Sequence, residues 1–419
     1  MKIKKLNKWI ENQKIKNKMT ISKLNIMDIL DWKIDNKKIH NENRSFFSIV
    51  PFKFSDSKRG EWFQPLIIQK EVGILGILKK QYKSVDYYLL QAKVEPGNIN
   101  GIQLSPTVQA TKSNYLRKHG GKKTNYLDFF IKKKKQLTTI SNLKLSEQGT
   151  RYLDKSNKNI LIDVKNAKIK KLKNYIWVTK KNLDFLLNKK NLLNMDTISV
   201  LSSSVKKNEI DNPINKHSII LNNLNDFKKR FTINKNIISF NNLGNWKIFK
   251  DKISDTKNKF FSILFLKIKT NSREVKEWSQ PIISDHHISC NVFLVKNVNN
   301  TIHYLLQTTL EPGFTYPKFT STISIKNYNS KNDNSKIKFF NFFKKKKKMI
   351  NFINSDEGGR FYKNETHNSI CFLRSKDKLA LKKYFIWVSH NQVVDLINKN
   401  LLSIEARNLF ASFNIDKIK

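Results

Sequence analysis

The chain has 419 residues, 39% of them hydrophobic and 11% aromatic, which is enough for two domains of roughly 200 residues, each with its own core. Its two cysteines exclude a disulfide framework, and no apolar run approaches the roughly 20 residues that a membrane-spanning helix needs. The formal net charge of +47 comes mostly from lysine, with only nine arginines among 80 basic residues, which favours the codon bias of an AT-rich genome over a nucleic-acid-binding surface.

Short apolar runs separated by turn residues dominate the first half of the chain. The first 20 residues are basic and lack an apolar stretch, so we expect no signal peptide and a cytoplasmic location. Strands are predicted at residues 45–54, 66–69, 74–78 and 87–93, and helices at residues 26–32, 127–134 and 182–193. This mixture predicts an α+β fold in which the tryptophans are mainly core residues.

A passage between residues 89 and 115 is rich in uncharged polar side chains. It reads LLQAKVEPGNINGIQLSPTVQATKSNY and follows a predicted strand. Such side chains on a framed loop suit a pocket for a sugar and a nucleobase, although an ordinary polar hairpin has a similar composition. The sequence contains no glycine-rich dinucleotide loop, Walker loop, nucleophile elbow or zinc-spaced cluster, so we expect neither a cofactor nor a metal.

Three polar stretches read as connectors rather than as core. The lysine runs at residues 132–135 and 344–348 are interpreted as solvated loops. Residues 206–229 are polar and contain an Asn-Pro break at residues 212–213, so we interpret them as part of a linker.

The second half of the chain repeats the landmarks of the first half in the same order. The shared segments are FFSI at residues 46–49 and 260–263, EWFQP at 61–65 with EWSQP at 277–281, YLLQ at 88–91 and 304–307, EPG at 95–97 and 311–313, SEQGTRY at 146–152 with SDEGGRF at 355–361, and IWV at 176–178 and 386–388. This pattern predicts a tandem duplication of one mixed-sheet domain. We place the repeats at residues 20–203 and 234–419, with a linker at residues 204–233.

These segments resemble the NDP-hexose 2,3-dehydratase family of deoxysugar biosynthesis. The resemblance rests on the polar passage with its continuation LRKHGG at residues 116–121, on EWFQPL, on GILG at residues 73–76, and on SEQGTRY and SDEGGRFY. It covers both repeats and implies that each half is Nudix-like, although neither half shows the paired glutamates of the Nudix metal box. It also implies a homodimer that acts on a dTDP-linked 4-keto-6-deoxyhexose, with a partner 3-ketoreductase that intercepts the product.

The implied reaction needs a base, an acid and oxyanion donors. A ketone at carbon 4 acidifies the hydrogen on carbon 3, so a base can remove it while the hydroxyl group leaves carbon 2. In the first repeat, Glu95 and His119 are candidates for base or acid, and Tyr115 for a donor near the sugar. The candidates for substrate binding are Arg117 at the pyrophosphate, Gln103, Thr107 and Gln109 at the sugar or thymine, and Trp62.

The second repeat has diverged, which leaves open which repeat holds the pocket. Its counterpart of residues 103–109 is largely lost, which favours the first repeat. If the second repeat holds the pocket, the candidates are Glu357, Arg360, Tyr362 and Arg407; the first repeat has Ile198 at the position of Arg407. Two alternatives remain: a catalytically inactive relative that still binds the nucleotide sugar, and a basic protein that binds nucleic acid without sequence specificity.

Overall fold

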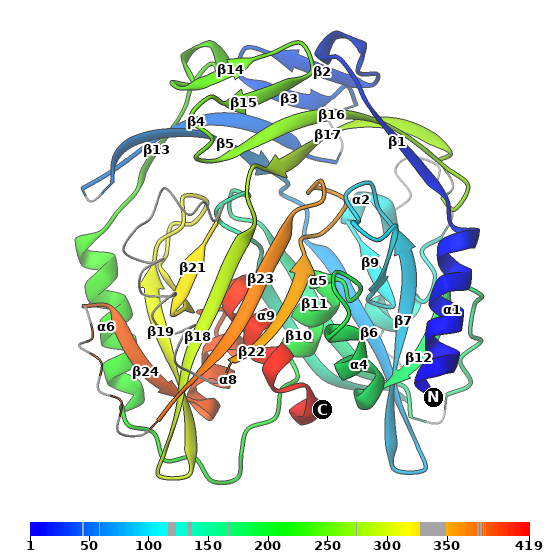
Figure 1. The fold of residues 1–419 in the computed structure, drawn as a ribbon, viewed down its shortest axis with the longest axis vertical. Coiled ribbons are helices and arrows are strands. Elements are labelled where there is room, and N and C mark those ends of the chain that lie inside the picture. The colour runs from blue at the N-terminus through cyan, green and yellow to red at the C-terminus, as the bar shows by residue number, and fades with distance from the viewer. Residues whose placement is uncertain are drawn as a thin grey trace.

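The computed structural model describes residues 1–43, 46–57, 59–115, 123–132, 136–165, 167–273, 275–326, 349–374, 377, 379, 381 and 383–419, with only the backbone at residues 114 and 115. Within these ranges the chain forms two seven-stranded and two five-stranded sheets with helices around them. Figure 1 shows the two five-stranded sheets together at the top and the two seven-stranded sheets side by side below. The expected α+β mixture is therefore confirmed.

The elements of the first half are α1 (Ile3–Lys16), β1 (Met19–Lys23), η1 (Ile26–Asp28), β2 (Trp32–Asp35), β3 (Lys38–Asn41), β4 (Ser48–Asp56), β5 (Gly60–Ile68), β6 (Gly73–Tyr82), β7 (Val85–Val94), β8 (Ile102–Ser105), β9 (Val108–Ala110), α2 (Lys112–Tyr115), α3 (Asp128–Ile131), β10 (Thr138–Ser146), β11 (Ser156–Asp163), β12 (Tyr175–Thr179), α4 (Lys180–Leu187) and α5 (Met195–Ser202).

The elements of the second half are α6 (His217–Arg230), β13 (Asn234–Ile237), η2 (Phe240–Asn242), β14 (Trp246–Ile248), β15 (Lys252–Asp255), β16 (Phe261–Thr270), β17 (Glu277–Asp285), β18 (Ser289–Val298), β19 (Thr301–Thr309), β20 (Lys318–Ser321), β21 (Ile323–Ile325), β22 (Met349–Ser355), β23 (Glu365–Leu373), β24 (Phe385–Ser389), α8 (His390–Asn398), α9 (Ile404–Phe413) and η3 (Ile415–Lys417).

The two halves have the same sheet topology. The seven-stranded sheets run β10-β11-β6-β7-β12 and β22-β23-β18-β19-β24, and each has one parallel pair, β11 with β6 and β23 with β18. The helix after the last strand begins with a capping box in both halves, at Thr179 in α4 and at Ser389 in α8. The repeated motifs therefore predicted two similar halves correctly.

The halves are interlocked because each contributes an edge strand to the other half's five-stranded sheet. Strand β1 from the start of the chain pairs antiparallel with β16, and β13 from the second half pairs antiparallel with β4. The largest apolar core cluster also spans both halves, from Leu6 in α1 to Ile418 near the end of the chain. The interface between the halves is thus continuous with the core, so groups held there are held rigidly.

Several predicted elements need correction. The helix expected at residues 26–32 is wrong: a single 3₁₀ turn is followed by strand β2, which starts at Trp32. Asp31 has a positive φ of 61°, which an α-helix does not accommodate, and the indole of Trp32 donates to the carbonyl of Ser279 in the other half. Here a contact between the halves overrides local helical spacing.

The other predicted elements agree in part. The four predicted strands coincide with parts of β4 to β7. The helix expected at residues 182–193 ends at Leu187, because Leu193 forms a bridge with Leu104 instead. The helix expected at residues 127–134 is the single turn α3. The stretch at residues 206–229, which the sequence suggests is a connector, overlaps helix α6, which ends at Arg230. Residues 133–135 and the lysine run at 344–348 lie outside the described residues.

Candidate functional site

A buried polar cavity of about 150 Å³ lies where the two halves meet. Its polar lining comes from the first half through Gln69, Lys93, Glu95, Gln109, Glu147, Tyr152, Lys155, Asn157 and Asp196, and from the second half through Arg273, Gln280, Glu357 and Arg360. Charged side chains are seldom buried in such numbers unless they act on one another or on a ligand. This cavity is therefore the candidate site.

A close approach between two loops builds the cavity. After strand β7 the chain turns at Gly97, whose amide donates to the carbonyl of Gly358 at 2.7 Å. A Cβ added to Gly97 would lie 1.6 Å from the carbonyl oxygen of Phe361, so only glycine lets the loops meet. This contact brings Glu95, just before the turn, against Glu357 in the facing loop.

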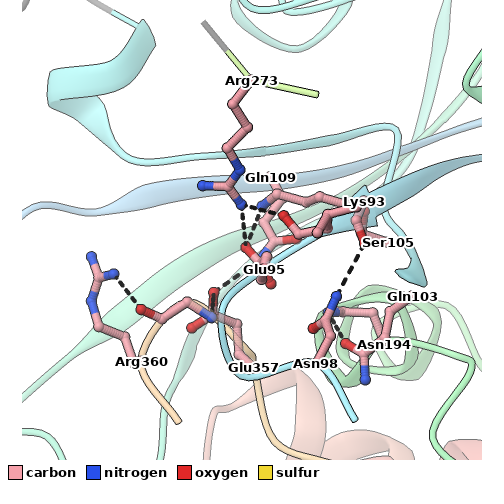
Figure 2. Close-up of polar contacts among 12 residues, drawn as sticks. Lys93, Glu95, Asn98, Gln103, Ser105, Gln109, Asn194, Arg273, Glu357 and Arg360 are labelled. Atoms are coloured by element: carbon pink, nitrogen blue, oxygen red, sulfur yellow. Dashed lines mark hydrogen bonds and ion pairs between the residues drawn. The ribbon is translucent and has the colours of Figure 1, made fainter. Parts of the chain in front are cut away.

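Glu95 is held as a carboxylate by two cations. Lys93 Nζ lies 2.8 Å and Arg273 Nη2 3.7 Å from Glu95 Oε1. Burial by itself would raise the pKa of Glu95, but these two charges outweigh it and lower that pKa. Figure 2 shows Glu95 between Arg273, which reaches in from the second half, and Glu357. Arg273 is anchored by a 2.6 Å hydrogen bond to the carbonyl of Val94.

Glu357 has the opposite electrostatic environment. Burial, followed by the negative charge of Glu95, raises the pKa of Glu357 to about 7. Its carboxylate accepts from the amide of Gly359 at 3.0 Å and from Gln109 Nε2 at 3.4 Å. A carboxyl group whose pKa lies near neutrality can both accept and return a proton, which is what a general acid–base residue needs.

Arg360 provides a cation that forms no salt bridge in the described part of the chain, although its charge acts on Glu357 in the same loop. Its Nη1 donates to the carbonyl of Gly359 at 2.9 Å, its guanidinium lies 4.1 Å from the ring centre of Phe47, and its buried Nε has no hydrogen-bond partner. Figure 2 shows Arg360 and Glu357 coming from the same loop. A half-buried guanidinium in this state is suited to binding an anion such as a phosphate.

The corresponding arginine of the first half, Arg151, is neutralised. It lies 4.6 Å from the ring centre of Phe261, as Arg360 does from Phe47, but its Nη2 also forms a 2.7 Å ion pair with Asp285. The position of Asp285 corresponds to Gln69 in the first half (285 − 69 = 216). Gln69 lines the cavity, and its buried Nε2 has no hydrogen-bond partner. Of the two corresponding arginines, Arg360 is therefore available to a ligand and Arg151 is not.

A second cluster of polar and charged side chains lines the cavity around Lys155. Its ammonium donates to the carbonyl of Glu71, and burial lowers the pKa of Lys155 to about 8. Burial also raises the pKa of Glu147 and Asp196, and Asn157 Nδ2 donates to Glu147 at 2.7 Å. The cavity thus holds two separate sets of proton-transfer groups, one around Glu357 and one around Lys155.

The structure brings four of the sequence-predicted site residues together, two from each half. Glu95 and Gln109 line the cavity with Glu357 and Arg360, which the sequence offered only as candidates for a separate pocket. Residues of both repeats contribute, so the candidate cavity belongs to neither repeat alone.

Gln103 and Thr107 occupy structural positions. Gln103 is fully buried and bonds to Ser355 and Asn194. Thr107 is fully buried as well, accepts from the amide of Leu78 at 3.0 Å and donates to the carbonyl of Leu89. Their hydrogen-bonding groups are engaged with the protein, so they support the cavity walls instead of lining them.

Three other candidates lie elsewhere in the described structure. Trp62 stacks on Phe54, with ring centres 5.2 Å apart, and Tyr362 packs on a separate apolar cluster. Arg407 is fully buried in α9, and its Nη2 donates to Ser199 at 3.1 Å. Arg117 and His119 lie outside the described residues, as does the side chain of Tyr115.

Sequence reasoning missed the cavity residues Lys93, Glu147, Tyr152, Lys155, Asp196 and Arg273. A signal for two of them was present: within otherwise matching segments, Tyr152 and Lys155 align with Phe361 and Asn364 (361 − 152 = 209; 364 − 155 = 209). Polar groups that appear in only one of two similar halves are candidates for a function that only one half performs. The others are placed by tertiary contacts alone.

The described residues contain no group of three or more His, Cys, Asp or Glu side chains that could hold a metal ion. In the same part of the chain, no helix has the length and apolar character needed to cross a membrane.

Comparisons with known proteins give consistent results over both halves. A family model described as NDP-hexose 2,3-dehydratase matches residues 3–203 and 218–413. Two proteins named dTDP-4-dehydro-6-deoxy-alpha-D-glucopyranose 2,3-dehydratase are each 28% identical to this chain. The alignment with the protein from Saccharopolyspora spinosa covers 97% of this chain and 90% of that protein. The alignment with the protein from Streptomyces violaceoruber covers 96% of this chain and 95% of that protein.

Among solved structures, the crystal structure of an ADP compounds hydrolase is 14% identical to this chain. The match covers 37% of this chain and 84% of the hydrolase, with a TM-score of 0.24.

Proposed function

The chain belongs to the NDP-hexose 2,3-dehydratase family, and from this premise we propose that it removes water from dTDP-4-dehydro-6-deoxyglucose to give the 3,4-diketo-2,6-dideoxy sugar. The observation that carries the assignment to this cavity is the contrast between the two arginines. Arg360 lines the cavity with a partly unsatisfied guanidinium, whereas Arg151 is paired with Asp285 at 2.7 Å. A diphosphate needs such a cation, and of these two arginines Arg360 offers one.

The carboxylates supply a physical basis for the first proton transfer. We assign Glu357 as the base that removes the hydrogen from carbon 3, because a pKa of about 7 suits a base that works near neutral pH. Glu95 is a positioning residue: ionised beside Lys93 and Arg273, it raises the pKa of Glu357. This proposal differs from the sequence-based expectation, in which Glu95 and His119 were the candidates for base or acid.

Negative charge develops on the oxygen at carbon 4 as the carbon 3 hydrogen is removed. Tyr152 lines the cavity and is buried, and burial raises the pKa of its hydroxyl well above the usual value, so the group stays protonated and can donate. We assign it the oxyanion-stabilising role that the sequence suggested for Tyr115. We also propose that Gln109, which donates to Glu357 at 3.4 Å, contacts the sugar ring.

The proposal extends to the wider organisation of the enzyme. We infer that the two similar halves arose by duplication of a Nudix-like domain, with repeats at residues 20–203 and 234–419, and that the enzyme is a cytoplasmic homodimer. The family resemblance supports these inferences. It also supports transfer of the product to a 3-ketoreductase.

The test is to incubate the purified chain with dTDP-4-dehydro-6-deoxyglucose in deuterated buffer and to trap the product for mass spectrometry. Loss of one water with deuterium at carbon 2 is expected. Unchanged substrate that still binds would identify an inactive relative. If the chain neither binds nor converts the substrate, the proposal is refuted. The nucleic-acid alternative is then tested by measuring whether the chain binds nucleic acid in a salt-dependent way.

A further inference from the structure

Lys155 is a buried ammonium inside the cavity to which the reaction assigned above gives no role. It lies between β10 and β11, is only 4% exposed and donates to the carbonyl of Glu71. The charged groups that act on it are Glu147, Arg360, Glu71 and Asp196. Burying an ammonium costs free energy that no single backbone contact recovers fully, so the position calls for an explanation beyond packing.

The second half shows that packing does not require a lysine here. Asn364 stands at the corresponding position, and the backbone is held in the same way: the amide of Glu147 donates to the carbonyl of Lys155 at 2.9 Å, and the amide of Asp356 to that of Asn364 at 3.2 Å. The Asn364 side chain accepts from the amide of Asp285 at 2.9 Å. A neutral amide therefore suffices for the fold, and the charged group appears only where the cavity is.

Resting on the proposed function, we propose that Lys155 is the general acid that protonates the hydroxyl group as it leaves carbon 2. Hydroxide is a poor leaving group, so an elimination that begins at carbon 3 also needs a proton donor at carbon 2. Lys155 and the Glu357 base come from different halves of the chain and line the same cavity.

The electrostatics suit donation. Burial lowers the pKa of Lys155 to about 8, so the ammonium predominates at neutral pH and is yet a stronger acid than a solvated lysine. When it gives up its proton, it becomes a neutral amine, the form that burial favours. Burial also raises the pKa values of Glu147 and Asp196, which favours their neutral forms, and a neutral carboxyl group stabilises the ammonium less than a carboxylate does.

The proton balance closes with these two residues. Glu357 takes the hydrogen of carbon 3 as a proton, the electron pair forms the double bond between carbons 2 and 3, and the carbon 2–oxygen bond breaks as Lys155 protonates the departing oxygen to water. In the resulting enol, Glu357 returns a proton to carbon 2 and the neutral Lys155 takes the proton of the hydroxyl group on carbon 3. Both residues end in their starting states, and one water has left.

The experiment compares two substrates in Lys155→Met and Lys155→Arg. With the natural substrate, kcat should fall by roughly 10²- to 10⁴-fold in both variants, because arginine keeps the charge but does not give up its proton. With the analogue that carries fluorine in place of the carbon 2 hydroxyl, fluoride leaves without prior protonation, so both variants should keep kcat within roughly tenfold of the wild type.

Lys318→Met is the matched control. Lys318 is also a buried lysine that donates to a backbone carbonyl, that of Asn400, and burial lowers its pKa to about 8 as well, but it lies outside the cavity. Its variant should keep the wild-type kcat for both substrates. In Lys155→Met, retained binding of dTDP together with an unchanged kcat on the natural substrate, or an equal loss on both substrates, would overturn the acid role. A wild-type protein that leaves the natural substrate unchanged would refute the proposed function itself.

Discussion

Replacing Gln69 with aspartate would copy into the cavity the ion pair that Arg151 of the first half already forms with Asp285 of the second half. The carboxylate of Asp285 lies 2.7 Å from Arg151, and Gln69 occupies the corresponding position beside the cavity that Arg360 lines. In Gln69→Asp the new carboxylate should pair with Arg360 and compete with the diphosphate. A hydrogen bond to a charged group contributes about 1.5–3 kcal/mol, and each 1.4 kcal/mol corresponds to a tenfold change, so dTDP should bind roughly 10- to 150-fold more weakly.

Isothermal titration calorimetry with dTDP measures this directly. Gln69→Asn removes the glutamine without adding a charge and should change the Kd much less. In an Arg360→Met background, Gln69→Asp should have little further effect, because the cation that it neutralises is gone. An unchanged Kd in Gln69→Asp, or an equal effect with and without Arg360, would refute the role of this arginine in binding the diphosphate.

Three further predictions follow from the same geometry. Glu357→Gln should lower kcat by roughly 10²- to 10⁴-fold. Since the pKa of Glu357 is about 7 in the native state and 4.5 ordinarily, the native state holds this proton more tightly, and wild-type stability falls as the pH rises from 4.5 to 7. Above pH 7 the variant should therefore melt at a higher temperature than the wild type. Gly97→Ala should raise the Kd for dTDP in calorimetry, because the new Cβ would lie 1.6 Å from the carbonyl oxygen of Phe361 and force the facing loop away; an unchanged Kd would contradict the role of this close approach. Asp285→Asn leaves Arg151 buried without its partner and should lower the unfolding free energy in urea by about 3–5 kcal/mol, and a loss below 1 kcal/mol would contradict the buried pair.

The repeated motifs allowed much of the architecture to be predicted. Segments such as EPG at residues 95–97 and 311–313 recur because each half needs the same turn, and a glycine that a neighbouring backbone approaches so closely has no substitute. Alternating apolar residues predicted strands β4 to β7, since the period of two places one face of each strand in the core. Hydrophobic period and turn chemistry are local properties, so they can be read along the chain.

Glu95 and Gln109 could be singled out from the sequence because they lie in an unusual polar passage. Glu357 and Arg360 were candidates only for a separate pocket, and Arg273 was not a candidate, because all three are separated from Glu95 and Gln109 by at least 164 positions along the chain (273 − 109 = 164). Gln103 and Thr107 lie in the same passage, but their polar groups are engaged with Ser355 and Leu89 inside the protein. Polarity in a sequence does not show whether a side chain faces a cavity or a neighbouring backbone.

The sequence by itself determined that the chain has two similar halves, which residues form parts of strands β4 to β7, and which family it resembles. Only the tertiary structure decided that the halves exchange strands β1 and β13 and that one cavity takes residues from both. It also decided that, among the described residues, Arg151 forms a salt bridge and Arg360 does not. The physical reason is that strand identity depends on neighbours along the chain, whereas the charge state of a buried group depends on whatever is packed against it. Arg360 and Arg151 differ in this way because one pair of corresponding positions, distant from both along the chain, holds Gln69 in the first half and Asp285 in the second half.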